Sequence, residues 1–178
     1  ELELALDKDN RFVALRLNML ANIGAYVGSD RNLLSPFGMI GTVLGVYLIP
    51  TAYINVVGVL SNTNPTAPYR GAGRPEAIYL IERLIEVTAR QLGKDPAKFR
   101  MQNYIKKFPH QTPVIMMYDT GNYGASMKKA LEMIDYKGLG KRKRDSGRAG
   151  KLRGIGFSCY IEACGIAPSA AVGSLGAG

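Results

Sequence analysis

The chain has 178 residues, of which 47% are apolar and 21% are charged, and its net charge is +9. This composition is ordinary for a globular protein and excludes a chain that is disordered throughout. Residues 137–153 contain eight Lys or Arg and one Asp, so they carry +7 and leave only +2 for the rest of the chain. Cys159, Cys164 and the single His110 do not make a zinc ligand set, so we expect no metal site from them and interpret the cysteines as free thiols in a cytoplasmic protein.

The N-terminal part of the chain is predicted to be β-structure. Residues 1–6 alternate polar and apolar side chains, residues 7–10 form a turn cluster, and the alternation then resumes. This pattern predicts a β-hairpin. Strict alternation would place Phe12 on one face of its second strand and Leu15 and Leu17 on the other.

A long uncharged segment lies between Arg31 and Arg70. The apolar run 37–49 is too short for a membrane-spanning helix, which needs roughly 20 residues, so we interpret it as a buried segment of a large protein. Residues 37–48 are compatible with a helix or a buried strand, and their apolar spacing favours a short helix. Residues 53–60 are rich in β-formers and predict a strand.

Three helices are expected in the middle of the chain. An apolar stripe with Pro75 in its first turn predicts an amphipathic helix that ends at Gly93. Asp95 is the expected N-cap of a second short helix to about residue 104, and residues 122–134 predict a third. On the first helix, the expected core side is Ile78, Ile81, Leu84, Ile85, Thr88, Ala89 and Leu92, and the expected solvent side is Glu82, Arg83, Glu86 and Arg90.

The basic stretch 137–153 lacks an apolar period and is predicted to be a flexible loop, followed by a last strand over 154–162. A nucleic-acid contact is one alternative for the basic residues, and docking on an acidic partner subunit is another. No aromatic residue lies between Tyr136 and Phe157 to stack on a base. The pattern therefore favours a solvated loop.

The glycine-broken stretch from Gly71 to Glu76 has several possible explanations. It is close to the opening of a dinucleotide-binding fingerprint, but Glu76 stands where the third glycine belongs, and Pro75 removes an N–H that would meet pyrophosphate. A purely structural tight turn remains open. A third possibility is a loop that brings bare backbone close to a ligand.

Several segments together resemble one family, the molybdenum hydroxylase large subunits, which includes xanthine dehydrogenase, aldehyde oxidase and aerobic-type carbon monoxide dehydrogenase. The loop and the start of the following helix, residues 62–83, are similar to the active-site loop of that family. The resemblance extends over essentially the whole chain. The other segments that carry it are Leu4–Asp9, Asp95–Pro96, Arg100 with Asn103, Tyr118–Tyr123, and Gly154–Phe157 with Glu162.

The resemblance implies an α+β fold, with residues 1–178 forming part of a molybdopterin-binding domain. It implies that Arg70, largely through its backbone, and Gly71 contact the molybdenum cofactor, and that Ala72 and Gly73 face the substrate pocket. The implied cofactor is molybdopterin, expected as the cytosine dinucleotide. The implied reaction is oxidation of an aldehyde or N-heterocycle with water as the oxygen source, with electrons passed to iron–sulfur and FAD partner subunits.

Two departures from the family pattern narrow the expected substrate. Carbon monoxide dehydrogenases carry a copper-binding cysteine where this chain has Gly71, so oxidation of carbon monoxide is not expected. Purine-oxidising members carry a phenylalanine that packs on the flat substrate at the position of Ala72, and alanine cannot stack.

Other family segments are not found in the sequence. These are an upstream glycine-rich segment, the downstream GQG segment that holds the pterin, and the late glutamate that acts as general base. Glu76 is expected in the first turn of its helix, and neither it nor Glu162 is expected to replace that base. We therefore expect an internal fragment of the subunit that is inactive as an isolated chain; the alternatives are a non-catalytic truncated remnant and a basic nucleic-acid-binding module.

Overall fold

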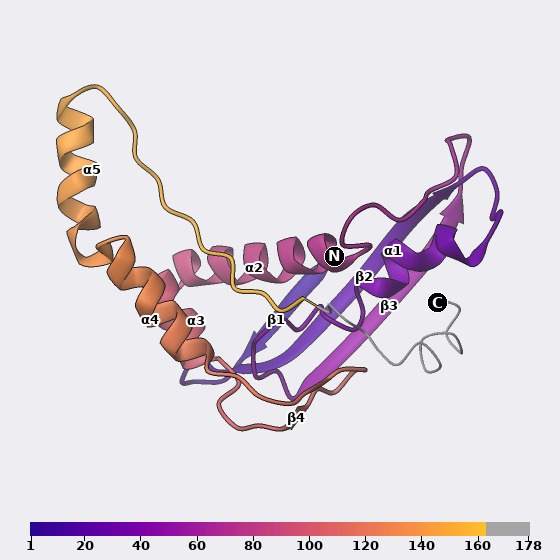
Figure 1. Cartoon of the computed structure of the whole chain (residues 1–178), viewed down its shortest axis with the longest axis horizontal. Helices are drawn as coiled ribbons and strands as arrows, with labels where there is room; N and C mark the ends of the chain where they lie inside the picture. Colours follow the sequence, from indigo (N-terminus) through magenta and orange to yellow (C-terminus); the bar gives the residue numbers. More distant parts are fainter. Residues whose placement is uncertain (163–178) are drawn as a thin grey trace.

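The computed structural model describes residues 1–162, which form a three-stranded sheet and a two-stranded sheet packed with helices (Figure 1). Strand β1 (Leu2–Leu6) pairs antiparallel with β2 (Phe12–Gly24), and β3 (Thr51–Leu60) lies parallel to β2 on its other side. The predicted hairpin and the predicted strand over 53–60 are therefore confirmed, within an α+β fold.

The hairpin contains a register shift that strict alternation does not reveal. The pairing of β1 with β2 skips from Phe12 to Ala14, so Val13 is an extra residue on β2. Because of this extra residue, Phe12 lies on the same face of β2 as Leu15 and Leu17, and all three belong to one buried core. The prediction that Phe12 and Leu15 lie on opposite faces was therefore wrong.

The chain between β2 and β3 begins with exposed residues and two short helices and then continues in turns that are mostly buried. A short 3₁₀ helix, η1 (Asp30–Leu33), leads into helix α1 (Leu34–Gly38), and irregular turns then continue to residue 46. The predicted helix over 37–48 was wrong beyond Gly38, because Gly45 has φ +57°, which a right-handed helix does not contain. The burial prediction was correct, since Met39, Val43 and Leu44 are at most 1% exposed.

Helix α2 (Arg74–Gln91) lies along the three-stranded sheet and contributes to the same core (Figure 1). It buries Ala77, Ile81, Ile85 and Ala89, whereas Leu92, which was expected inside, is 41% exposed. Helix α3 (Pro96–Gln102) begins as predicted, because the Asp95 carboxylate accepts hydrogen bonds from the N–H groups of the first turn.

The C-terminal part of the described chain leaves the sheet and then returns to it. Strands β4 (His110–Gln111) and β5 (Met117–Tyr118) form the small sheet and precede α4 (Tyr123–Met133), the third predicted helix. A 3₁₀ turn, η2 (Tyr136–Gly138), leads to α5 (Leu139–Arg148), which stands away from the sheet (Figure 1). The chain then runs back along α2.

Two predictions about this C-terminal part were wrong. Most of the basic stretch is the helix α5, because Lys and Arg are good helix formers and Lys141 and Asp145 pair at 2.8 Å across one helical turn. Residues 154–162 are extended but pair with no strand of the described chain. None of the helices within residues 1–162 has the length and apolarity needed to cross a bilayer.

Candidate functional site

The loop before α2 has an unusual backbone. Gly71, Ala72 and Gly73 all lie in the left-handed region, with φ values of +92°, +42° and +95°. Glycine adopts this conformation freely, whereas a residue with a Cβ is held there at a cost of about 1–2 kcal/mol. The loop is therefore specified by its two glycines and carries strain at Ala72.

The two glycines are also required by close packing inside the chain. A Cβ on Gly71 would lie 2.7 Å from the ring carbons of Pro75, and a Cβ on Gly73 would lie 2.2 Å from the carbonyl oxygen of Ser35 in α1. Gly73 is buried, whereas Tyr69 and Arg70 are exposed. The loop therefore presents one side to α1 and leaves the Tyr69–Arg70 side open.

The loop and the start of α2 gather hydrogen-bond donors and positive charge. Ala72 N–H donates to the Tyr69 carbonyl at 2.7 Å, and Arg74 N–H donates to the Gly71 carbonyl at 3.0 Å, while the Gly71 and Gly73 N–H groups donate to no other group within residues 1–162. The Arg74 side chain lies beside the same loop, with Nη1 3.5 Å from the Gly71 carbonyl oxygen. The positive end of the α2 dipole adds to this field.

Comparison with known proteins gives this loop its context. The family model of the molybdopterin cofactor-binding domain matches residues 1–104, which is more than half of the chain. The chain belongs to this family of molybdenum hydroxylase large subunits. Residues 69–73 lie within the matched part. We call them the cofactor loop after the role that we propose for them below.

Individual relatives agree with the family. The chain is 36% identical over 183 residues to the carbon monoxide dehydrogenase large chain of Hydrogenophaga pseudoflava, covering 99% of this chain and 23% of that one. It is 27% identical to the nicotine 6-hydroxylase large subunit of Paenarthrobacter nicotinovorans, and the match covers 92% of this chain and 20% of that subunit. Quinoline 2-oxidoreductase from Pseudomonas putida 86 has the same fold over 84% of this chain and 19% of its own, with a TM-score of 0.73 and 29% identity. The chain thus spans about a fifth of the length of the relatives it matches.

The cofactor loop fits the group that this family binds. Molybdopterin carries phosphate, and its metal carries oxygen and sulfur ligands, so a binding loop needs N–H donors and positive charge. The Gly71 N–H, which has no acceptor within residues 1–162, supplies a donor, and the exposed Arg70 supplies charge. Arg74 adds a second charge, which Glu162 partly balances at 3.7 Å. Glu76 is exposed in the first turn of α2, as predicted, and contributes no donor to this set.

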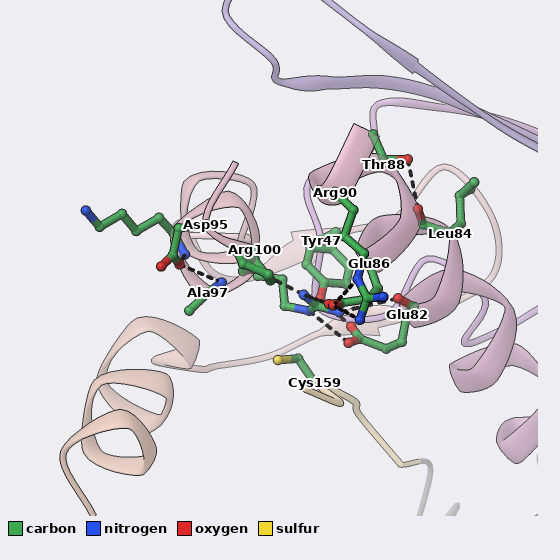
Figure 2. Close-up of polar contacts among 12 residues, drawn as sticks. Tyr47, Glu82, Leu84, Glu86, Thr88, Arg90, Asp95, Ala97, Arg100 and Cys159 are labelled. Atoms are coloured by element: carbon green, nitrogen blue, oxygen red, sulfur yellow. Dashed lines mark hydrogen bonds and ion pairs between the residues drawn. The ribbon is translucent and has the colours of Figure 1, made fainter. Parts of the chain in front are cut away.

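A buried ionic network joins α2 and α3 (Figure 2). Arg100 is 0% exposed, and its Nε donates to Glu82 Oε2 at 3.0 Å while its Nη1 donates to Glu86 Oε2 at 3.0 Å. The Tyr47 hydroxyl donates to the other Glu82 oxygen. The prediction that Glu82 faces solvent was wrong, since it is 6% exposed.

Burial determines the protonation behaviour of this network. It raises the pKa of the Glu82 carboxyl, although the Arg100 guanidinium and the Tyr47 hydroxyl oppose the shift. Burial and the neighbouring Glu82 charge also raise the pKa of Tyr47. A neutral Tyr47 donating to a Glu82 carboxylate that is paired with Arg100 satisfies all three groups.

The network also holds the segment that follows α5. The Arg100 guanidinium carbon lies 5.4 Å from the centre of the Phe157 ring, and the Tyr104 hydroxyl donates to Cys159 Sγ at 3.1 Å. Burial raises the pKa of the Cys159 thiol, which disfavours its reactive thiolate form. Beyond it, Glu162 Oε1 lies 3.7 Å from Nε of Arg74, which brings the end of the segment to the cofactor loop.

The sequence contains one indication of this network, the pair Arg100 and Asn103, whose burial the helical pattern of apolar residues does not predict. These two residues form one of the segments that resemble the family, and both are buried side chains. Asn103 accepts a hydrogen bond from Phe12 N–H at 3.0 Å and donates to the Asn10 carbonyl at 3.2 Å, so it joins α3 to the hairpin. Within residues 1–162, no three His, Cys, Asp or Glu side chains gather in a way that could hold a metal ion; Cys164 lies outside the described residues.

Proposed function

We propose that the chain is part of the large subunit of a molybdenum-dependent hydroxylase that oxidises an aldehyde or an N-heterocycle. The observation that carries the proposal is the cofactor loop, a donor-rich backbone with three consecutive left-handed residues at the positive end of α2. The family membership supports the same conclusion. The bound cofactor would supply the two-electron oxidation, with water as the oxygen source.

In this proposal, the loop residues divide between holding the cofactor and shaping the substrate pocket. Arg70 and Gly71 hold the cofactor. Gly71 does so through its N–H, which has no acceptor within residues 1–162, and Arg70 through its backbone, while its exposed side chain adds positive charge. Ala72 and Gly73 border the substrate pocket, Ala72 with a side chain short enough to leave room for a ring and Gly73 through its backbone alone, because its Cβ position faces α1. Fixed donors at a water-excluded site stabilise negative charge without reorganising during the reaction.

The substrate class follows from what the loop lacks. Gly71 has no thiol to hold copper, which argues against carbon monoxide despite the similarity to carbon monoxide dehydrogenase. Ala72 has no ring to stack on a purine. Two relatives, named for nicotine and quinoline, act on N-heterocycles, and they make this class of substrate the one to test first.

The complete enzyme is proposed to use molybdopterin cytosine dinucleotide and to pass electrons to iron–sulfur and FAD subunits. Its general base and pterin anchors would come from parts of the subunit outside this chain, so we expect the isolated chain to be inactive. We place the enzyme in the cytoplasm, because free thiols such as Cys159 are typical of reducing compartments.

A chimeric subunit tests the proposal. The matching segment of the Hydrogenophaga carbon monoxide dehydrogenase large chain would be replaced by this chain, and the enzyme assayed for molybdenum content and for oxidation of carbon monoxide, quinoline and benzaldehyde. We expect bound molybdenum, oxidation of quinoline or benzaldehyde, and no oxidation of carbon monoxide. A chimera that holds molybdenum and oxidises only carbon monoxide would contradict the proposed substrate class.

Two variants of the chimera serve as controls. Gly71→Cys restores the copper-binding thiol of the parent enzyme, and it is combined with Pro75→Ala because a Cβ at position 71 would otherwise lie 2.7 Å from the Pro75 ring. This double variant is expected to recover oxidation of carbon monoxide. Arg70→Ala removes positive charge beside the cofactor but keeps the backbone donors, so it is expected to lower turnover more than molybdenum content. A chimera that assembles normally but contains no molybdenum, whatever the residue at position 70, would contradict the cofactor role of the loop.

A further inference from the structure

We infer that Gly38, at the end of α1, is a positioning residue for the cofactor loop. The inference rests on the proposed function, because it concerns how α1 fixes the position in which the loop would contact the cofactor. Gly38 is 34 residues away from Ala72 in the sequence, and no motif connects them.

The contact between α1 and the loop is backbone against backbone on both sides. A Cβ on Gly38 would lie 2.5 Å from the carbonyl oxygen of Ala72. In the opposite direction, a Cβ on Gly73 would lie 2.2 Å from the Ser35 carbonyl oxygen and 2.7 Å from the Met39 N–H nitrogen. Each segment therefore has a glycine where the other approaches, and a methyl group on either would force them apart.

The neighbours of this contact prevent α1 from yielding. Met39, next to Gly38, is 0% exposed and belongs to the main core. Ala77, in the first turn of α2, is also 0% exposed, and its N–H donates to the Gly73 carbonyl at 3.0 Å. Between these two fixed points, the exposed Tyr69–Arg70 side of the loop has the least packing to resist movement.

Gly38 tests this contact more cleanly than either loop glycine. Its φ is not in the left-handed region, whereas those of Gly71 and Gly73 are +92° and +95°. Alanine at position 38 is therefore compatible with the backbone and favours the helix. Any effect of Gly38→Ala must come from the contact with the Ala72 carbonyl.

The experiment measures amide hydrogen exchange in the 178-residue chain. Gly38→Ala is expected to speed exchange of the Ala72 and Arg74 amides by about tenfold or more, because their hydrogen bonds lie in the displaced loop, while the middle of α2 is unchanged. Gly41→Ala is the matched control, because its Cβ would meet only the flexible Met116 side chain, at 3.4 Å. It is expected to leave loop exchange unchanged.

Unchanged loop exchange in Gly38→Ala would overturn the inference. Equal acceleration of exchange throughout the chain would also overturn it, because it would indicate a general structural role.

A second readout uses the chimera. Gly38→Ala is expected to keep the molybdenum content, alter the molybdenum(V) spectrum, and lower kcat with little change in KM. Faster loop exchange with an unaltered spectrum and kcat would also overturn it. If the unsubstituted chimera binds no molybdenum, the proposed function fails while the exchange result still decides whether Gly38 positions the loop.

Discussion

Helices α2 and α5 both carry several charged side chains, but these charges are held in opposite ways. On α2, Glu82 is buried and meets Tyr47, 35 residues earlier, and Arg100, 18 residues later. On α5, the ion pairs stay within a few residues, such as Lys141 with Asp145 at 2.8 Å. Helix α5 buries no residue at all.

This difference shows that charge density does not identify the charges on which a fold depends. A buried ion loses its hydration and must be compensated by partners, so removal of one partner is costly. An exposed ion keeps its hydration, and its pairs contribute little. The predictions below test whether α2 and α5 differ in this way.

The largest expected effect is from Arg100→Met. The substitution fills much of the same space but leaves the Glu82 carboxylate buried without its cation, with the Tyr47 hydroxyl and the Cys159 backbone as its remaining partners. Breaking a buried pair in this way typically costs about 3–5 kcal/mol. Urea unfolding followed by circular dichroism should show this loss as a lower midpoint at an unchanged slope.

Two comparisons make this prediction specific. Arg90→Met breaks a pair with Glu86 from an arginine side chain that is 67% exposed, and should cost no more than about 0.5 kcal/mol. Since burial raises the pKa of Glu82, the deficit of Arg100→Met should shrink as the pH falls through that pKa, because a protonated carboxyl needs no cation. Equal losses for Arg100→Met and Arg90→Met would show that burial does not distinguish them.

Asn103→Ala should have the next largest effect. Its side chain accepts a hydrogen bond from Phe12 N–H and donates to the carbonyls of Asn10 and Phe99. Alanine would leave these backbone groups without their side-chain partner in and near the core. An unsatisfied buried group costs about 1–3 kcal/mol. The neighbouring Gln102→Ala removes one exposed hydrogen bond to the Asp9 carbonyl and is the matched control, measured by the same urea unfolding.

An effect of Asn103→Ala no larger than that of Gln102→Ala would contradict this account. It would mean that the hairpin does not depend on α3 for its position. The expected result makes Asn103 the neutral counterpart of Arg100, because both are buried polar side chains of the same short segment.

The sequence predicted well the features that depend on neighbours along the chain. The start of α2 at its glycine loop, the Asp95 cap and the burial of Ile81 and Ile85 all follow from local spacing. The glycine-broken loop could be recognised from the sequence because Gly71, Gly73 and Pro75 lie close together along the chain. Its assigned roles, from Arg70 to Gly73, stay predictions.

The features that sequence reasoning missed depend on residues far apart. Glu82 lies at a polar position of the α2 pattern, and only α3 and Tyr47 make that position a buried one. Val13 disrupts the alternation because β1 pairs around it. The contact of Gly38 with the Ala72 carbonyl joins two segments with no shared motif.

The smallest expected effect is from the double substitution Lys143→Gln and Arg144→Gln on α5. Both side chains are exposed, and within residues 1–162 neither has an ion-pair partner, so the loss in free energy of unfolding should stay within about 0.5 kcal/mol.

The same variant tests whether α5 binds nucleic acid. If α5 bound nucleic acid, binding of a fluorescent oligonucleotide would fall steeply with salt, and loss of two charges would reduce the salt dependence. We expect weak binding with no preference between the two proteins. A steep salt dependence that the double variant abolishes would instead give α5 a function that the buried Glu82 of α2, whose partners are Tyr47 and Arg100, cannot have.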